Sequence, residues 1–312
     1  MNEDHTPHQP AHLYVADDVA AAIEAGRPVV ALESTLISHG LPRPDNIVVA
    51  RQVEATVRRQ GAVPATIGVL DGRVIVGLDD AQLEHLATSD EVIKVSLRDL
   101  APAVAAGRTG ATTVASTAAV AARVGISVFA TGGLGGVHRG ARETWDESAD
   151  LLALAATPVT VVCSGVKSIL DVAATLERIE SLSIDLVGYR TSRFPGFYLT
   201  DSGFPVPWQV DSAEEVADLM RVRHDLALRP GALIVANPLP PGKQVDPAMH
   251  ERVLAEALAA AAAGGVTGKD VTPYLLAHFH RSTQGQSMEA NVAIILGNAA
   301  LGADIAVAAG RR

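Results

Sequence analysis

The 312-residue sequence has little cysteine and few aromatic side chains. Cys163 is its only cysteine, which excludes an internal disulfide and a cysteine-based zinc site. Phe, Trp and Tyr together make up 4% of the residues, and alanine and valine supply much of the apolar content. We therefore expect a core of closely spaced helices and β-branched strands, in a protein of the reducing cytoplasm.

Positive charge is also scarce, since the formal net charge is −10. This balance argues against a protein that binds nucleic acid or an anionic membrane non-specifically. The N-terminal residues MNEDHTPHQPAH lack the basic and apolar regions of a signal peptide. The runs ALAAAAAGG and ANVAIILGNAALGADIAVAAG are interrupted by glycines and polar residues, so we expect buried helices there rather than membrane spans.

Predicted strands and helices alternate along the chain. Helical patterns occur at 14–26, 45–61, 112–125, 146–156 and 168–181, and strand-like apolar runs at 28–34, 91–97, 126–131, 159–166, 184–190 and 231–239. The pair Asp71-Gly72 between two apolar runs predicts a hairpin over 66–78. The alternation predicts an α/β fold with a central mixed, largely parallel β-sheet and helices on both faces. We expect residues 1–12 to form a disordered tail and residues 13–312 a single α/β domain.

Reactive side chains gather where the predicted strands end. Glu33 closes one strand, Lys94 lies within EVIKVSL, Thr131 and His138 flank a glycine run, and Lys167 follows VVCSGV. In open α/β sheets, ligands bind beyond the carboxyl ends of the strands. Each residue alone is compatible with an ion pair or a side chain that reaches water. Their common placement favours a functional site.

The glycine-rich stretch TGGLGGVHRG, 131–140, allows two interpretations. Glycines let backbone N–H groups converge on an anion, and His138 and Arg139 add positive charge. A purely structural turn is the alternative. The stretch is neither a P-loop nor a dinucleotide fingerprint, and GGVTGKD at 264–270 also lacks the P-loop pattern.

The segment RETWDESADLL, 142–152, predicts a helix start with an acidic face. Thr144 and Glu147 have the spacing of a capping box. Asp146 and Asp150 are four residues apart, so we expect them on one face of a helix. Carboxylates so placed either bind a hard cation such as Mg²⁺ or Mn²⁺ or complement the helix N-terminus.

A family resemblance rests on several long motifs taken together. They are ALESTLISHGLPRPDN, PATIGVLDG, FATGGLGGVHRG, TWDESADL, VVCSGVKSILD, FPGFY, NPLP and SMEANVAIILGNAALGADIA. From about residue 14 to 309 the chain closely resembles the indigoidine synthase A-like family of pseudouridine-5′-phosphate glycosidases. Gly196 stands where the family pattern has alanine, and Trp145 and Glu147 are local variants, which bears on the shape of the pocket.

The resemblance implies reversible cleavage of pseudouridine 5′-phosphate with water to uracil and ribose 5-phosphate. By motif position, Lys167 would be the nucleophile and Glu33 the proton donor and acceptor. Asp146 would bind one Mn²⁺ per subunit, with other divalent ions as alternatives. The substrate would contact Lys94, Val114, Ser148, Ala149 and Asp150, and its phosphate Thr131, His138 and Asn291. The resemblance also implies a homotrimer.

Two other classes of function stay open at this point. A Schiff-base lyase or aldolase acting on another sugar phosphate would share Lys167 and a phosphate site. A non-catalytic nucleotide- or sugar-phosphate-binding protein would keep the fold, although pure binding needs no lysine nucleophile. A sugar kinase is disfavoured, because ALGAD at 300–304 lacks the glycine-rich anion site expected there.

Overall fold

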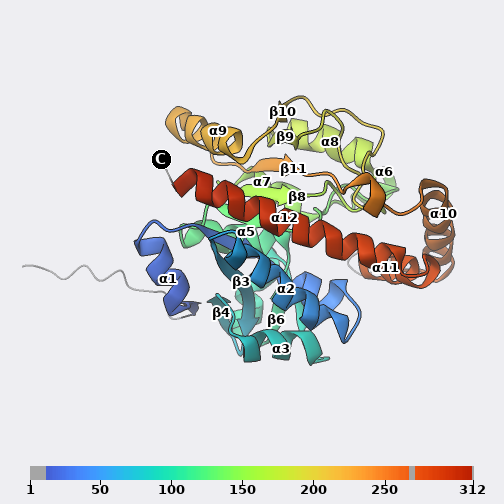
Figure 1. Ribbon diagram of the computed structural model, residues 1–312. Helices are drawn as coiled ribbons and strands as arrows, with labels where there is room; N and C mark the ends of the chain where they lie inside the picture. Colours follow the sequence, from blue (N-terminus) through green and yellow to red (C-terminus); the bar gives the residue numbers. More distant parts are fainter. Residues whose placement is uncertain (1–11, 267–270, 311–312) are drawn as a thin grey trace, which may run out of the picture.

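The computed structural model describes residues 12–266 and 271–310 (Figure 1). Within these residues an 11-stranded sheet has the order β1-β4-β3-β2-β7-β8-β11-β9-β10, with β6 also paired to β3 and β5 to β6. The strands are β1 Leu13–Val15, β2 Val29–Leu32, β3 Val63–Leu70, β4 Arg73–Val76, β5 Ile93–Val95, β6 Gly110–Thr112, β7 Val128–Ala130, β8 Thr160–Cys163, β9 Asp185–Tyr189, β10 Gln209–Val210 and β11 Leu233–Ala236. Apart from His12, the expected tail lies outside the described residues.

The helices alternate with these strands. They are α1 Asp17–Glu24, the π-helix η1 Leu36–Gly40, α2 Asp45–Arg59, α3 Asp80–Thr88, α4 Leu97–Ala105, α5 Val114–Arg123, α6 Ala141–Thr144, α7 Ala149–Ala155, α8 Val172–Ser181, α9 Ala213–Leu226, the 3₁₀ turn η2 Pro241–Lys243, α10 Pro247–Ala263, α11 Val271–Ser282 and α12 Gln286–Gly310.

The sheet is mixed and largely parallel, as predicted. From β3 through β2, β7, β8, β11 and β9 to β10, each strand is parallel to its neighbour. The strands β4 and β6 are antiparallel to β3. The predicted hairpin is confirmed as β3–β4, where Asp71 and Gly72 have φ angles of 47° and 75°, which suit a tight hairpin turn.

Helices cover both faces of the sheet, because side chains alternate along each strand. In β2, Val29 and Ala31 belong to a core shared with α5, α7 and α8. Val30 and Leu32 belong to a second core shared with α2, α9 and α12. Figure 1 shows α12 crossing the front of the sheet between α9 and α2. Both cores are rich in valine and alanine, in keeping with the low aromatic content.

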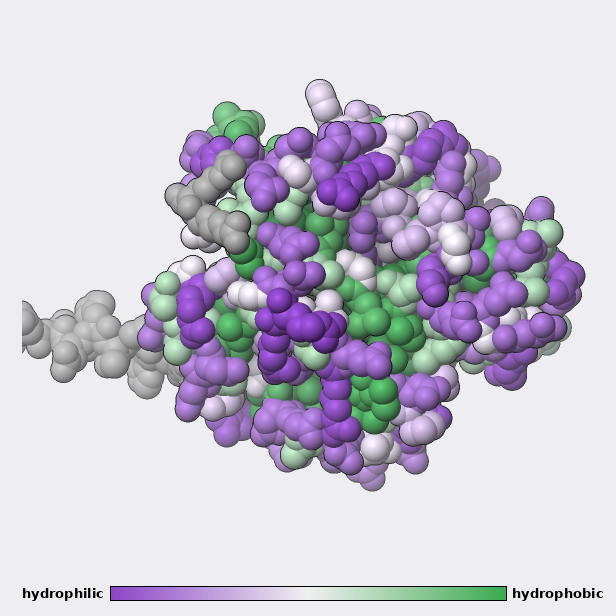
Figure 2. Space-filling view, viewed as in Figure 1, coloured by the Kyte–Doolittle hydropathy of each residue, from purple (hydrophilic) through white to green (hydrophobic). Residues whose placement is uncertain are grey.

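The helix α12 is long and apolar. By length and composition it is the one helix among the described residues that could cross a membrane, yet 56% of its most apolar window is buried in the protein. It packs on β2, β7 and β8. Figure 2, in the same view, shows apolar residues along the middle of this face. The half-buried side chains of α12 include Val292, Leu296 and Ala300. The expectation of a buried helix is confirmed.

Short elements differ from the sequence predictions. Residues 14 and 15, expected to begin a helix, belong to β1, which pairs with β4. Thr112, expected to begin another helix, is the last residue of β6, which pairs with β3 and β5. Three residues are too few to show a period, so neighbouring strands decide their conformation.

Candidate active site

The carboxyl ends of three adjacent strands carry the residues expected to act on a substrate. Strand β7 lies between β2 and β8. Glu33 directly follows β2, Thr131 directly follows β7, and Lys167 lies four residues beyond β8. A loop therefore presents Lys167, and its backbone N–H donates to the Leu134 carbonyl at 3.1 Å. The sheet brings the two expected catalytic residues to the carboxyl ends of neighbouring strands.

Glu33 is half-buried, and its carboxylate accepts a hydrogen bond from the Thr131 hydroxyl. Burial raises the pKa of this carboxyl above its usual range. The charge of Lys167, the hydrogen bond from Thr131 and the charge of Lys94 all lower that pKa, whereas the charge of Asp150 raises it. The resulting carboxyl keeps its proton at a higher pH than an exposed glutamate does, as suits a general acid.

His138 and Asp146 lie beside the same two lysines. Nδ1 of His138 is 3.7 Å from Oδ2 of Asp146, and the His138 N–H donates to the Asp146 carbonyl at 3.0 Å. Burial lowers the pKa of His138, the charge of Asp146 raises it, and the charges of Lys167 and Lys94 lower it further. One electrostatic environment therefore includes five expected site residues, namely Glu33, Lys94, His138, Asp146 and Lys167.

Hydroxyl groups join the segment after β2 to β3 and β6. The Ser34 hydroxyl donates to the Ile67 carbonyl at 2.6 Å and accepts the Thr112 N–H at 2.9 Å. The Thr35 hydroxyl donates to the Thr112 carbonyl at 2.8 Å. These bonds set Glu33 near the start of α5, where Val114 is buried. Sequence reasoning gave Ser34 and Thr112 no role.

The buried side chain of Asp150 connects three segments by hydrogen bonds. Its Oδ1 accepts the Ala115 N–H at 3.0 Å, and its Oδ2 accepts the Gly135 N–H at 2.9 Å. The Asp150 N–H donates to the Ser148 hydroxyl at 3.2 Å, which caps α7. The carboxylate thus joins the N-termini of α5 and α7, with Ala149 as the first residue of α7, to the glycine-rich stretch.

The expected helix over 146–156 is wrong at its start. The helix α7 begins at Ala149 with Ser148 as its cap, so the predicted capping box of Thr144 and Glu147 does not form. Asp146 lies in the segment between α6 and α7 and does not share a helix face with Asp150.

A left-handed residue and an ion pair explain that break. Trp145, with φ of 57°, ends α6 in a conformation that a continuing helix does not contain. Glu147 then forms an ion pair with Arg178 of α8, with 2.9 Å between Oε2 and Nε. Neither feature is visible in a residue period.

The glycine-rich stretch serves packing at most of its positions. A Cβ on Gly135 would lie 2.2 Å from the Ser148 hydroxyl oxygen, and one on Gly136 would lie 2.4 Å from that of Thr175. The Leu134 N–H donates to the Gly165 carbonyl, and the Val137 N–H donates to Thr175. These N–H groups are bonded within the protein, which favours the structural interpretation over an anion cradle at 134–137.

Asn291 lies in α12 beside the start of this stretch. It is buried, and its Oδ1 has no hydrogen-bond partner among the described residues. A Cβ on Gly132 would lie 3.8 Å from that oxygen. A buried carbonyl oxygen without a partner is costly unless a ligand or water donates to it. Because this oxygen accepts, Asn291 suits an N–H or hydroxyl of a substrate better than the expected phosphate oxygens.

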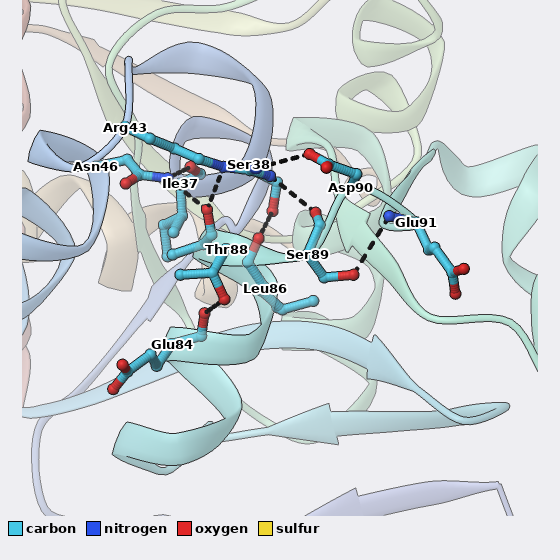
Figure 3. A network of polar contacts seen from close by, with 11 residues as sticks. Ile37, Ser38, Arg43, Asn46, Glu84, Leu86, Thr88, Ser89, Asp90 and Glu91 are labelled. Atoms are coloured by element: carbon cyan, nitrogen blue, oxygen red, sulfur yellow. Dashed lines mark hydrogen bonds and ion pairs between the residues drawn. The ribbon is translucent and has the colours of Figure 1, made fainter.

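The segment after Glu33 is anchored to the last turn of α3 (Figure 3). The Ser38 hydroxyl donates to the Leu86 carbonyl at 2.8 Å. Arg43 Nε and Asn46 Nδ2 both donate to the Ala87 carbonyl, at 2.8 and 2.9 Å. These side chains satisfy the carbonyls that a helix leaves unpaired at its C-terminus, and they fix η1 at the border of the site.

The sequence profile described as "Indigoidine synthase A like protein" matches residues 18–308. The chain belongs to this family. A relative from Salinispora tropica named pseudouridine-5′-phosphate glycosidase is 62% identical over 301 residues, which cover 96% of this chain and 93% of the relative. One of the same name from Streptomyces griseus is 60% identical, over 94% of this chain and 90% of the relative.

Two crystal structures have the same overall fold as this family member. The prealnumycin C-glycosynthase AlnA in complex with ribulose 5-phosphate aligns with a TM-score of 0.89 and 37% identity, over 97% of this chain and 98% of that one. An indigoidine synthase A-like protein from Thermotoga maritima aligns with a TM-score of 0.86 and 37% identity, over 96% and 98%.

The residues present limit how this family member could hold the expected Mn²⁺. No group of three or more His, Cys, Asp and Glu side chains suited to a metal occurs within 12–266 and 271–310. The Asp146 carboxylate is 32% exposed, whereas both oxygens of Asp150 accept backbone N–H groups. A hard divalent ion held by one carboxylate and otherwise by water and phosphate fits this arrangement.

Proposed function

We propose that this chain reversibly cleaves the carbon–carbon glycosidic bond of pseudouridine 5′-phosphate, taking up water and releasing uracil and ribose 5-phosphate. The observation that carries the proposal is the pair Glu33 and Lys167 beyond the carboxyl ends of β2 and β8. The charge of Lys167 acts on Glu33, and burial raises the pKa of the Glu33 carboxyl. The names of the relatives support the substrate.

The chemistry explains why a lysine is needed. Carbon is a poor leaving group, so protonating an oxygen or nitrogen of the base, as at ordinary glycosidic bonds, is insufficient. In the proposed first step the neutral amine of Lys167 forms a bond to C1′, the C1′–O4′ bond opens, and O4′ takes up a proton. The nitrogen then supplies the electron pair that expels the base.

In the second step the lysine nitrogen forms a double bond to C1′ as the bond from C1′ to C5 of uracil breaks. C5 takes a proton from Glu33, whose raised pKa suits proton exchange. Water then adds to the iminium carbon, which releases ribose 5-phosphate and the free amine. Glu33 is also the nearby carboxylate that can accept a proton from Lys167 before attack.

The remaining site residues are proposed to hold the substrate. Lys94 supplies positive charge for the phosphate, and His138, whose pKa is lowered, offers a ring N–H. Asn291 offers an Oδ1 without a partner among the described residues, which accepts a hydrogen bond from an N–H or hydroxyl of the substrate. The proposed substrate contacts at the N-termini of α5 and α7 are Val114, Ser148, Ala149 and Asp150. The Thr131 hydroxyl is bonded to Glu33, which supports a role beside that carboxylate more than a phosphate contact.

Asp146 is the residue proposed to hold Mn²⁺ or another divalent ion. A bound divalent cation supplies charge that neutralises phosphate and orients it. Homotrimer formation and a cytoplasmic location complete the proposal. They rest on the family resemblance and, for the location, on a single buried cysteine.

The activity is tested by incubating the protein with Mn²⁺ and pseudouridine 5′-phosphate and measuring free uracil. Release above a control without enzyme is the expected result, and a level equal to that control would overturn the glycosidase. A panel of other sugar phosphates tests the aldolase alternative, because cleavage of one of them without uracil release would favour that class.

The covalent step is tested by adding borohydride during turnover and mapping the adduct by mass spectrometry. The expected product is a ribose-phosphate adduct on Lys167, because borohydride reduces an iminium to a stable amine. Lys167→Ala should lose both adduct and turnover. Lys243→Ala, which removes an exposed lysine in η2, is the matched control and should keep both. Wild-type turnover in Lys167→Ala would overturn the lysine mechanism alone.

A further inference from the structure

Four sequence motifs meet at one buried side chain, Asn298 of α12. Thr131 comes from FATGGLGG, Ser164 from VVCSGVK, Asn237 from NPLP, and Asn298 from AIILGNAAL. At most 1% of the surface of Asn298, Thr131 and Ser164 is exposed. The proposed reaction gives Asn298 and Asn237 no part, so their place in these motifs needs another explanation.

Asn298 bonds to the carboxyl ends of three neighbouring strands. Its Nδ2 donates to the carbonyl of Thr131 after β7 at 2.8 Å, and lies 3.2 Å from the hydroxyl oxygen of Ser164 after β8. Its Oδ1 accepts from Nδ2 of Asn237, after β11, at 2.9 Å. The Ser164 hydroxyl in turn donates to the Asn237 carbonyl at 2.8 Å. The amide group uses both its donor and its acceptor end.

The two anchored segments carry the groups of the proposed reaction. The Thr131 hydroxyl donates to the Glu33 carboxylate, so the position of the Thr131 backbone decides whether that bond forms. Ser164 begins the loop that ends in Lys167. A shift of either backbone segment would therefore change the distance between the proposed acid and the proposed nucleophile.

We propose that Asn298 is a positioning residue, which holds the Thr131 backbone and the start of the Lys167 loop so that the Thr131 hydroxyl stays on the Glu33 carboxylate. The inference deepens the proposed function and rests on it for the meaning of Glu33 and Lys167. A buried network with every member bonded is rigid, whereas an apolar residue at 298 would leave the Asn237 amide without its acceptor.

The test compares Asn298→Ala, Thr131→Val and the double variant. The hydrogen bond from Thr131 lowers the pKa of Glu33, so its loss in Thr131→Val should raise that pKa. Asn298→Ala should raise it in the same direction, and the double variant should move it no further than Thr131→Val does. Lys167, Lys94 and Asp150, the other charged groups that act on Glu33, are unchanged in all three.

The readout is a titration of the Glu33 carboxyl by NMR with ¹³C-labelled glutamate, assigned by the signal missing in Glu33→Gln. It needs no substrate, so it is independent of whether uracil is released. In the activity assay, Asn298→Ala should lower kcat on the order of 10- to 100-fold with little change in KM. If Asn298→Ala does not fold, Asn298→Ser replaces it with the same expected direction.

Thr157→Val is the matched control. It also removes a buried hydrogen bond, from the Thr157 hydroxyl to the Ala153 carbonyl at 2.7 Å, but before β8 rather than after it. It should lower Tm and leave the Glu33 titration unmoved. An unshifted titration in Asn298→Ala, or additive shifts in the double variant, would overturn the positioning role. Absence of uracil release by the wild type would overturn the proposed function instead.

Discussion

Burial destabilises the charged form of the Glu33 carboxyl. Burial raises its pKa even though Lys167, Thr131 and Lys94 all stabilise the charged form. A residue chosen for stability alone would carry no charge at this position. The cost makes sense if the proton is used, because a general acid works best with a pKa near the operating pH.

Glu33→Gln should separate stability from activity. The folded pKa lies above the unfolded value, so the native state binds the extra proton and its stability falls as pH rises through the folded pKa. We therefore expect Glu33→Gln to have a higher Tm than wild type at pH 8 and a similar Tm near pH 4.5. Uracil release should fall by on the order of 10²- to 10⁴-fold.

Calorimetry at several pH values and a uracil assay measure both effects. Glu177→Gln, an exposed exchange of the same chemistry on α8, is the control and should change neither. A Glu33→Gln variant with a lower Tm than wild type at pH 8 would contradict the assignment of Glu33 as an acid strained by burial.

At the residue scale, the sequence singles out the proposed reacting groups but not the side chains that hold them in place. Glu33 and Lys167 stand out because a charged residue ends an apolar run. Asn298 bonds to a residue 167 positions away, and Ser34 to one 78 positions away. Such partners are set by how the strands assemble, so no local pattern in one sequence reveals them.

At the scale of single elements, several long segments and short strands within apolar runs were predicted, whereas the three-residue strands β1 and β6 were not. The helices α2 and α12 follow their apolar patterns, and the β3–β4 hairpin follows its Asp-Gly turn. The break between α6 and α7 depends on Trp145 and on an ion pair of Glu147 with Arg178. It moves Asp146 out of the expected helix face, so the structure changes the geometry of the candidate metal site.

Two glycines of α12 should respond oppositely to substitution. A Cβ on Gly302 would lie 3.2 Å from Cβ of Ala130, with Val30 and Val128 at 3.6 and 3.7 Å, so Gly302→Val should overpack the sheet. We expect a loss of roughly 1–3 kcal/mol in the free energy of unfolding. Gly297 is exposed, and its nearest neighbour, Asn237, would be 3.9 Å away.

Gly297→Ala is therefore the matched control in the same helix. Alanine favours a helix over glycine, so the free energy of unfolding should rise by about 0.5–1 kcal/mol. Urea unfolding followed by circular dichroism measures both variants. Equal stability of the two would show that α12 does not depend on close approach to the sheet at Gly302.

At the scale of the whole molecule, alternation of strands and helices sufficed to predict the architecture. A mixed, largely parallel sheet between two helical layers is what the pattern indicated and what the structure has. The way α10 and α11 join the body was not predictable, because their sequences show only helical content. Figure 1 shows these two helices together at one end of the molecule, beyond α12.

His250 of α10 lies at that junction, buried and 5.3 Å from the ring of Phe279, which is itself 5.6 Å from Tyr198. Burial, with the charge of Arg139, lowers the pKa of His250 to about 4. The unfolded chain binds a proton near pH 6.5, and the folded chain only near pH 4. This residue should therefore cost up to roughly 3 kcal/mol of stability as pH falls from 6.5 to 4.

His250→Gln should remove that cost, so its free energy of unfolding should fall less than that of wild type between pH 6.5 and pH 4. Other acidic groups titrate equally in both proteins and cancel in the difference. His85→Gln, an exposed exchange on α3, should follow wild type. Urea unfolding at half-unit pH steps measures the slopes. If the free energy of unfolding of wild type and of His250→Gln had the same pH dependence, the His250 ring would be protonated while α10 stays packed. The loss of stability in acid would then not come from His250.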